Sequence, residues 1–402
     1  MRKIKVKMIV DQSIAVFEKE AFEKELKQGI LSFWTDHMVD QTHGGYYGRI
    51  GYDNRLHENA DKGLILNARI LWTYATAYDL YKETEYFHQS KMAFNALRDF
   101  RDAKHKGVYW MISAEGKPVK TKKQIYAQAF AIYGLAAYYK ISHNPLALSW
   151  AIELFELIEK HSFDKDRNGY FEAFDREWHL LDDLRLSDKD NNEVKTMNTH
   201  LHILEAYTGL YKVWEDERLG ERLRNLTELF FDRFLGEDNH FKLFFDEHWN
   251  LKSDEISYGH DIEAGWLLHE AALALQDGAL IHIAERHAVY VTQATLPYFD
   301  QDGGLFNTGV PGEITDKEKH WWPQAEALVG LINAYKISKL PKLKMAAEKC
   351  WLFIQDQIID REHGEWIWGI DAKGNRMKED KAGPWKCPYH NGRAMMELIK
   401  RL

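Results

Sequence analysis

Histidine, tryptophan and acidic residues gather in four short segments of the sequence. These segments are KTMNTHLHILEA (195–206), SYGHDIEAGWLL (257–268), KHWWPQAEA (319–327) and GPWKCPYHNGRAMMEL (383–398). Imidazoles gain and lose protons near neutral pH, so this composition is suited to general acid–base chemistry. In the second segment, His260 and Glu263 are three residues apart and share one face of a helix. The carboxylate could orient the imidazole and raise its basicity; a surface ion pair is the alternative interpretation.

A second candidate, His390, follows the aromatic loop WKCPY (385–389) at the start of the last apolar segment. By itself, a histidine there caps a helix or packs in a core more often than it reacts. Internal repeats, however, place His260, His390 and either His202 or His200 at equivalent helix starts. Because such helix starts converge in a closed ring, we expect these histidines around one cavity.

Other site chemistries find less support in the sequence. It contains no HExxH, and the possible metal ligands come one or two per repeat, so we predict no metal site. Glu263 and Glu326 could form the paired carboxylates of a glycoside hydrolase, but that interpretation leaves the histidines without a role. GxGxxG, Walker and GxSxG motifs are also absent, which disfavours phosphate binding and serine acyl transfer.

Aromatic residues near these segments have two possible roles. Trp321, Trp322 and Trp385 could be core residues, the commoner fate of aromatics at helix ends. Next to Pro323 and within polar loops, they could instead offer flat apolar faces on which pyranose rings stack.

Arg69 lies inside the apolar stretch GLILNARILWTYA. An arginine on a buried helix must be paired with a carboxylate, such as that of Glu326, or face a cavity. Tyr126 and Gln128 in QIYAQAF are weaker candidates of the same kind.

A glycine-aromatic hairpin pattern recurs along the whole chain. The segments are GGYYGRI (44–50), GVYWMIS (107–113), GYFEAFD (169–175), HFKLFFD (240–246), GGLFNTG (303–309) and GEWIWGI (364–370). Between Gly45, Gly107, Gly169, Gly304 and Gly364 the steps are 62, 62, 135 and 60 residues, and the step of 135 divides around His240. The glycines are interpreted as turn formers. The chain therefore contains six repeats of about the same length.

An apolar segment with helical spacing follows each hairpin. Aligned by pattern, these segments begin with a polar residue each time: Asn67, Gln128, His200, Glu263, Gln324 and Asn391. Two positions later lie Arg69, Phe130, His202, Gly265, Glu326 and Arg393. A second, weaker helix fills each interval, for example 149–161 and 217–234. An open solenoid is possible, but polar helix starts suggest one shared, wet pocket, so we predict an all-α, (α/α)6 barrel with short β-hairpins in the inter-helix loops.

Composition supports one globular enzyme-sized domain, residues 1–402, because no linker or low-complexity segment interrupts the chain. With 53 Lys and Arg against 62 Asp and Glu, the formal charge of −9 disfavours a nucleic-acid partner. No apolar run is long enough for a membrane helix, and the two cysteines are too few for a disulfide scaffold. We therefore expect a protein without membrane association, located in the cytoplasm.

These motifs resemble the N-acylglucosamine 2-epimerase superfamily, and are most similar to its cellobiose 2-epimerase branch. The resemblance lies in NADKGLILNARILW, MNTHLHILEAYT, YGHDIEAGWLL, WWPQAEAL and GPWKCPYHNGRAMME, which span residues 59–397. It implies an (α/α)6 barrel, with His260 and His390 as the acid/base pair and Glu263 as their supporting carboxylate. The substrate-binding residues that it implies are Arg69, Asn198, His202 (with His200 competing for that role), Trp322, Glu326, Trp385 and Tyr126.

The resemblance also implies a reaction. A reducing β-1,4-linked disaccharide such as cellobiose or lactose would be inverted at C2 through an enediolate, stabilised by Arg69 and Asn198, with neither cofactor nor metal. The protein would be a monomer or a weak homodimer with a small sugar as its partner. Rival readings are a mannose 2-epimerase or aldose–ketose isomerase on the same barrel. More distant are a glycoside hydrolase or lyase and a non-catalytic helical repeat that binds a partner.

Overall fold

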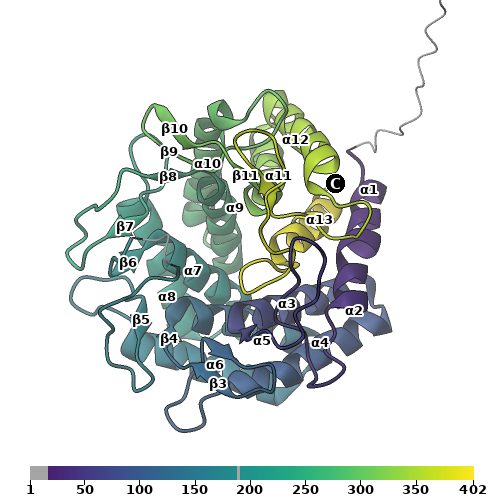
Figure 1. The fold of residues 1–402 in the computed structure, drawn as a ribbon. Helices are drawn as coiled ribbons and strands as arrows, with labels where there is room; N and C mark the ends of the chain where they lie inside the picture. Colours follow the sequence, from purple (N-terminus) through teal and green to yellow (C-terminus); the bar gives the residue numbers. More distant parts are fainter. Residues whose placement is uncertain (1–16, 188–190) are drawn as a thin grey trace, which may run out of the picture.

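Two concentric rings of helices form the molecule (Figure 1). The computed structural model describes residues 17–187 and 191–402. Within that part of the chain, six helices make the inner ring, and each packs against the next, with the last packing against the first. They are α3 (Leu64–Tyr81), α5 (Ile125–Ser142), α7 (Met197–Tyr211), α9 (Tyr258–Leu275), α11 (Trp321–Ser338) and α13 (Tyr389–Arg401).

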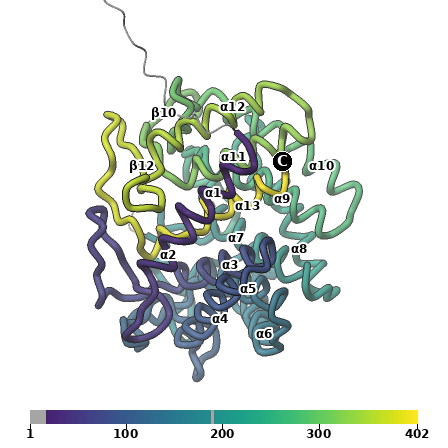
Figure 2. Tube along the Cα trace, turned by 90° about the vertical axis from the view of Figure 1, so that its right-hand side faces the viewer, coloured from purple at the N-terminus to yellow at the C-terminus, as the bar shows by residue number. Residues whose placement is uncertain are grey.

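The outer ring alternates with the inner one along the chain, as the turned view in Figure 2 also shows. Its first member is continuous through α1 (Lys19–Lys24), the π-helical η1 (Glu25–Leu31) and α2 (Ser32–His37). The others are α4 (Thr84–Leu97) with η2 (Arg98–Phe100), α6 (Pro145–His161), α8 (Glu217–Leu229) with η3 (Phe230–Phe234), α10 (Gly278–Thr295) with η4 (Leu296–Tyr298), and α12 (Pro341–Phe353) with η5 (Ile354–Ile358). This alternation confirms the predicted (α/α)6 barrel.

Residue patterns explain which helices lie inside. In α3 the residues from Leu64 to Ala75 are buried without a break, because the helix is covered both by its ring neighbours and by the outer ring. In α8 only one stripe is buried, with Leu219, Leu223 and Leu226 at helical spacing and charged residues on the opposite face. No helix in the described part of the chain is long and apolar enough to cross a membrane.

Short connections join each inner helix to the next outer one. In four cases the inner helix ends at a residue in the left-handed conformation, namely Lys82, His143, Gln276 and Lys339. The following outer helix then begins within a few residues. In three of these four cases it has Asn144 or Asp277 as a side-chain N-cap, or proline in the first turn. These stops and starts keep this end of the barrel free of long loops.

Longer connections, with the hairpins, lie at the other end of the barrel. Six antiparallel bridges open the hairpins: Val39–Tyr46, Arg101–Val108, Phe163–Tyr170, Leu235–Phe241, Phe299–Leu305 and Ile359–Trp366. The predicted repeat of six hairpins is therefore observed. The turn glycines Gly45, Gly107, Gly169 and Gly364 have positive φ, but in the fifth hairpin the positive φ belongs to Gly303, not to Gly304. At Gly107 a Cβ would also lie 2.7 Å from the Trp178 ring, so only glycine fits there.

Each strand that precedes an inner helix pairs with the hairpin of the next repeat. The pairs are β1 (Lys62–Gly63) with β2 (Met111–Ile112), β4 (Lys123–Gln124) with β5 (Ala173–Phe174), β6 (Lys195–Thr196) with β7 (Phe244–Phe245), β8 (Ile256–Ser257) with β9 (Thr308–Val310), and β11 (Lys319–His320) with β12 (Gly369–Ile370). β3 (Pro118–Lys120) and β10 (Glu313–Asp316) extend two of these ladders. Ile50 pairs with Ala382, so the last repeat is joined to the first. The loops thus form a closed ring above the inner helices.

In several repeats, one polar position near the inner helix start anchors the hairpin. The Gln128 side chain accepts a hydrogen bond from the Val108 backbone N–H and donates one to the Val108 carbonyl, and Gln324 does the same with Leu305. In the fourth repeat the equivalent residue is Asp261, which accepts the Phe241 N–H at 2.7 Å. The sequence alignment that put Glu263 in this column is therefore wrong by two residues. Two acidic residues, Asp261 and Glu263, lie about half a helical turn apart, and the pattern of residue types does not distinguish them.

Candidate active site

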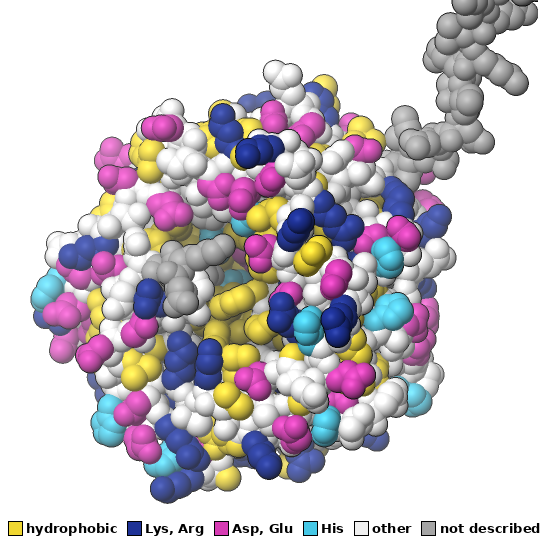
Figure 3. Space-filling model, viewed as in Figure 1, with side chains coloured by type: hydrophobic (Ala, Val, Ile, Leu, Met, Phe, Trp, Pro, Cys, Tyr) yellow, Lys and Arg dark blue, Asp and Glu magenta, His cyan; other side chains and the backbone are white. Residues whose placement is uncertain are grey.

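The first turns of α7, α9 and α11, with the strands that precede them, border a cavity of about 370 Å³ on the hairpin face of the barrel. In the space-filling view the middle of this face is hollowed and has an apolar floor (Figure 3). Asn198, His260 and Trp322 line the cavity at the starts of α7, α9 and α11, together with loop residues that include Glu172, Leu243, Asn307, Asp316 and His320. A larger groove of about 1050 Å³ lies outside the barrel, between α1–α2 and the 359–364 loop, and includes none of the candidate residues.

Trp322 adjoins both histidines that the sequence singled out. Its ring centroid is 4.7 Å from that of His260 and 5.7 Å from that of His390. His260 is half-buried, and His390 is 6% exposed. Imidazoles separated by 130 residues of chain therefore face one aromatic platform. Trp321, by contrast, is buried against Trp368 at 4.5 Å and belongs to the core.

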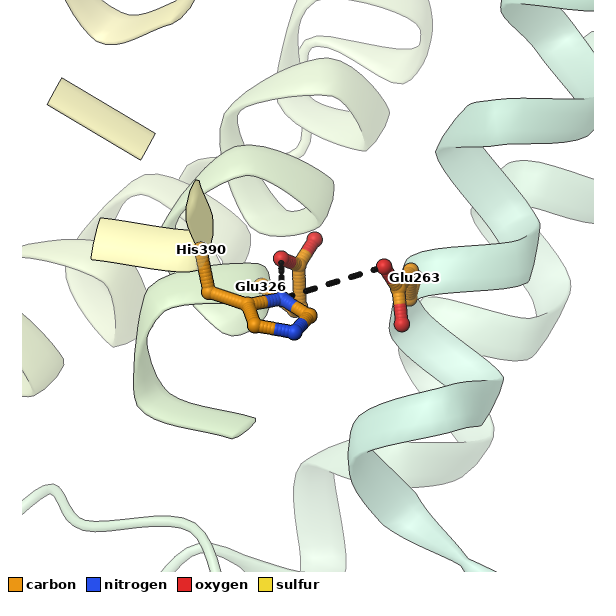
Figure 4. Close-up of side chains that lie close together, drawn as sticks. All are labelled: Glu263, Glu326 and His390. Carbon is orange, nitrogen blue, oxygen red and sulfur yellow. Dashed lines mark hydrogen bonds and ion pairs between the residues drawn. The ribbon is translucent and has the colours of Figure 1, made fainter. Parts of the chain in front are cut away.

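Two carboxylates hold His390 in place (Figure 4). His390 Nδ1 lies 2.6 Å from Glu326 Oε1 on α11 and 3.9 Å from Glu263 Oε1 on α9. Because an ionised carboxylate only accepts hydrogen bonds, Nδ1 carries the proton and Nε2 keeps its lone pair. His390 is thus oriented by Glu326, with the tautomer that a general base needs.

His260 has a different partner from the one predicted. Its Nδ1 lies 2.8 Å from the Ser257 hydroxyl, just before the start of α9. Glu263 turns instead toward the barrel axis, where it contacts Arg393 and His390. The expectation that Glu263 orients His260 is therefore wrong: the hydroxyl of Ser257, the residue before the first turn of α9, takes that position.

The third histidine of the cluster is His202. Its Nδ1 donates to Glu205 Oε2 at 2.9 Å, and its ring meets the Tyr126 ring edge-on at 4.9 Å. His200 is buried elsewhere: its Nε2 accepts the Tyr170 N–H at 2.8 Å and its Nδ1 faces the Thr196 carbonyl at 2.6 Å. With both ring nitrogens used by the backbone, His200 has none left for a substrate, which corrects its inclusion among the candidates.

Arg69 extends from α3 without a carboxylate partner. Its Nη2 donates to the Tyr126 hydroxyl at 2.8 Å, and its guanidinium lies over the rings of Phe130 at 4.2 Å and Tyr389 at 4.6 Å. In residues 17–187 and 191–402 no acidic side chain lies within ion-pair distance of it, so the suggested salt bridge to Glu326 is absent. Its Nη1 also donates to the Cys387 sulfur at 3.9 Å. A buried cation held by aromatic faces, a hydroxyl and a thiol attracts negative charge.

Two more predicted residues border this region. The Trp385 ring lies 6.1 Å from Tyr126 and 5.7 Å from Trp110, and it is partly exposed. The Asn198 Oδ1 atom is shielded from solvent and has no hydrogen-bond partner in the described residues, although its side chain lines the cavity. Both are available to a ligand, one for stacking and one for a polar contact.

Burial governs the charge of the histidines. It lowers the pKa of His260 to about 3 and brings the pKa values of His202 and His390 below their ordinary range. All three imidazoles are consequently neutral at neutral pH. A neutral imidazole can accept a proton, as a base must before reaction.

The carboxylates divide into two kinds. Burial raises the pKa of Glu326, and burial together with the Glu326 charge raises that of Glu263 well above its usual range. For Glu205, burial acts in the same direction, but Arg393 and His202 lower its pKa to about 2. Glu205 is therefore ionised, whereas the Glu263–Glu326 pair favours holding one proton. Because the pKa of Glu263 is raised further, that proton belongs on Glu263, and Glu326 is the ionised partner of His390.

Glu263, Glu326 and His390 also have the composition of a metal site. One possible ligand atom from each residue lies within 4.8 Å of the other two. The same carboxylate oxygens, however, lie 2.5 and 2.7 Å from Nη2 of Arg393. A cation bound to the three residues would collide with this guanidinium. The donor set therefore suits arginine rather than a metal ion.

Sequence reasoning passed over three residues of this cluster. Arg393, Glu205 and Tyr389 form a buried network in which Glu205 accepts from both other side chains. Arg393 stood in the same aligned column as Arg69, His202 and Glu326, so its position was a usable signal. Glu205 also had a signal, since it follows His202 by three residues, the spacing that singled out His260 and Glu263. Tyr389 had none, because its role depends on contacts across the barrel.

Comparison with known proteins gives concordant matches over the whole barrel. The sequence model of the N-acylglucosamine 2-epimerase (GlcNAc 2-epimerase) family matches residues 45–394. A cellobiose 2-epimerase of Bacteroides fragilis is 48% identical over 385 residues, covering 95% of this chain and 98% of that protein. The solved structure of cellobiose 2-epimerase from Bacillus thermoamylovorans B4167 superposes with a TM-score of 0.90 at 40% identity, covering 96% and 99% of the two chains. A D-mannose isomerase structure has a TM-score of 0.86 at 20% identity, covering 96% of this chain and 99% of that one, a likeness of fold.

Proposed function

Because the chain belongs to the N-acylglucosamine 2-epimerase family, we propose that it inverts C2 at the reducing end of β-1,4-linked disaccharides. Cellobiose would become glucosyl-mannose, and lactose would react in the same way. The observation that carries this proposal is the pair of neutral imidazoles, His260 and His390, which both adjoin the Trp322 ring. A sugar stacked on that ring would have its C2 near both bases, and two bases that approach from different directions can act on opposite faces of one carbon.

The reaction starts from the open-chain aldehyde of the reducing sugar. Its C2 hydrogen is acidic because it is α to the carbonyl, and an imidazole removes it as a proton. The electron pair left at C2 delocalises to O1, which gives a cis-enediolate. Return of a proton to the opposite face of C2 then restores the aldehyde with inverted configuration. No electrons are exchanged with a cofactor, so the proposed reaction is cofactor-independent and needs no metal.

The negative oxygen of the enediolate requires fixed donors. Arg69 supplies a guanidinium that has no carboxylate to neutralise it, and it is already held in place by Tyr126 and two aromatic rings. Such preorganised charge stabilises a developing anion without reorganisation during the reaction. Asn198 can accept from or donate to a substrate hydroxyl, and Trp322 and Trp385 can stack on sugar rings.

The two histidines would have different roles in the proton cycle. The geometry of His390, with Nδ1 donated to Glu326, supports a base acting through Nε2. His260 is hydrogen bonded to the Ser257 hydroxyl, which can either donate or accept. This partner is therefore compatible with both neutral tautomers of the imidazole. We propose that one histidine removes the proton from one epimer and that the other returns it, with the roles exchanged in the reverse direction.

The remaining features of the proposal are coarser. The barrel would act as one catalytic domain, as a monomer or a weak homodimer, in the cytoplasm. The two cysteines, Cys350 and Cys387, are free and buried, which is consistent with a reducing compartment.

The decisive experiment is incubation of the purified protein with cellobiose, lactose, mannose and N-acetylglucosamine separately in D2O, without metal or nucleotide. We expect the C2 epimer of the disaccharides, with one deuterium at C2. A ketose product would establish an aldose–ketose isomerase, in which the proton returns to C1. A new reducing end would indicate glycoside cleavage, and no reaction with any sugar would refute the proposal.

A further inference from the structure

Arg393 on α13 occupies the centre of the buried layer beneath the catalytic cavity and is 1% exposed. Its Nη1 donates to the Glu205 carboxylate on α7 and to the Tyr389 hydroxyl. Its Nη2 donates to Glu263 Oε1 at 2.5 Å and to Glu326 Oε1 at 2.7 Å. One guanidinium thus joins carboxylates from three neighbouring inner helices.

The charge balance of this layer makes the guanidinium necessary. Three carboxylates are buried there, and two of them face Nδ1 of His390. Nearby, His202 is neutral, and the guanidinium of Arg69 on α3 lies 4.6 Å from the Tyr389 ring that Arg393 also contacts. Buried carboxylates without a cation take up protons instead of remaining ionised. Arg393 is the cation that touches all three.

Protonation of Glu326 would change His390. As an ionised acceptor, Glu326 fixes the proton on Nδ1 and leaves Nε2 free. If its Oε1 carried a proton, it would donate to Nδ1, and the imidazole would hold its own proton on Nε2. In that tautomer His390 cannot take a proton from C2.

We propose that Arg393 is a positioning residue of the reaction: by keeping Glu326 ionised, it holds His390 in the tautomer whose Nε2 is free to act as base. The inference rests on the proposed function for its catalytic consequence. The tautomer itself is independent of any substrate.

A second cavity gives access to Arg393 from the opposite end of the barrel. This space of about 170 Å³ is lined by Arg393, Glu205, Trp72, Tyr133 and Trp266, and it reaches residues near the C-terminal ends of the inner helices, such as Lys140 and Lys212. Arg393 and its partners therefore separate it from the catalytic cavity. Truncation of Arg393 would enlarge this cavity, so a small cation could enter the vacated position without passing through the substrate site.

The test uses the full-length variants R393K, R393M and R393A. We expect R393A to lower kcat on cellobiose by about 100-fold with little change in KM, because a general base has been lost but the sugar contacts remain. Guanidinium chloride at non-denaturing, millimolar concentrations should raise the kcat of R393A by at least about 10-fold, and the effect should saturate. Ethylammonium should restore less, because it lacks the planar pair of donors. The control is R401A: Arg401 lies on the same helix and pairs with Glu270 and Glu397. This variant should retain wild-type kcat, and guanidinium should not change it.

A substrate-free measurement separates this inference from the proposed function. Nitrogen-15 NMR of the histidine side chains, with His390 assigned from an H390Q spectrum, should show Nδ1–H in the wild type and Nε2–H in R393M. R393K keeps the positive charge and serves if the larger truncations do not fold. It should show a mixture of the two His390 tautomers. An unchanged tautomer in folded R393K and R393M, or wild-type kcat in either, would overturn the inference. A wild-type enzyme without epimerase activity would instead refute the proposed function and leave the tautomer test standing.

Discussion

Two columns of mostly polar residues run round the same six helices and have different tasks. The first (the anchor column) contains Asn67, Gln128, His200, Asp261, Gln324 and Asn391; the second (the axial column) contains Arg69, Phe130, His202, Glu263, Glu326 and Arg393. The anchor residues bond mostly to hairpin backbone, whereas most axial residues bond to side chains of other helices. The two columns are two residues apart on each helix. Because two residues correspond to about 200° of rotation round the helix axis, their side chains face nearly opposite directions. Polarity near a helix start therefore does not by itself indicate chemistry.

The largest effects should come from the two bases themselves. H390A and H260A should each lower turnover of cellobiose by about 100- to 10,000-fold, the usual contribution of a general acid or base. Thermal unfolding should show that both variants remain folded. The control is H179A, which removes an exposed hairpin histidine and should retain full turnover. Near-normal activity in H390A or H260A would defeat the assignment of the acid/base pair.

A matched glutamine pair compares the columns directly. H202Q should lower kcat/KM by about 10- to 100-fold, because it removes an imidazole held by Glu205 beside Tyr126. H200Q should change kcat/KM by less than about threefold, since Gln128 and Gln324 occupy the same position in other repeats and hold their hairpins. Steady-state kinetics on cellobiose measure both. The reverse ranking would mean that the anchor column contributes to the reaction.

An acidic pair gives a smaller but separable contrast. E263Q should lower kcat by about 10-fold through the altered contacts with Arg393 and His390, with a modest effect on stability. D261N should retain kcat but lose about 1–3 kcal/mol of unfolding free energy, because His240 and the Phe241 N–H lose a charged partner. Steady-state kinetics and urea unfolding of both variants test this contrast. Equal losses of kcat in E263Q and D261N would contradict the distinction between the columns.

The smallest expected effect is a pH dependence of stability. Burial lowers the pKa of His200 from 6.5 to about 3, so the unfolded chain takes up this proton first as the pH falls. This histidine's contribution is complete above pH 6.5 and is lost progressively toward pH 3, at about 1.4 kcal/mol per pH unit. Urea unfolding between pH 7 and pH 5 should therefore show H200Q gaining on the wild type as the pH falls. Parallel curves for the two proteins would contradict a neutral, buried His200.

Much of the architecture could be predicted because it is written in local patterns. The hairpin spacing and the apolar segments predicted the six repeats, and their bounds agree with α6 and with α8 plus η3. The register of the fourth helix could not be predicted, since Asp261 and Glu263 are both acidic and both near the helix start. Only the contact of Asp261 with Phe241 identifies the anchor.

For the candidate site, sequence identified most of the residues but not how they pair. His260, His390, Glu326 and Arg69 were all singled out, yet the partner of His260 is Ser257, and the partner of Arg69 is Tyr126 rather than a carboxylate. Spacing along a helix shows which side chains share a face. It does not show which of them finds a partner on another helix.

The sequence by itself determined the repeat, the helix and hairpin order, and the kinds of side chain at the helix starts, because each depends on residues close together in the chain. Tertiary structure alone decided which column faces the axis, that Trp322 adjoins two imidazoles, and that Arg393 joins three carboxylates. These outcomes depend on the relative rotation of helices that lie far apart in sequence. They also depend on burial, which sets the protonation state of each group only once the ring has closed.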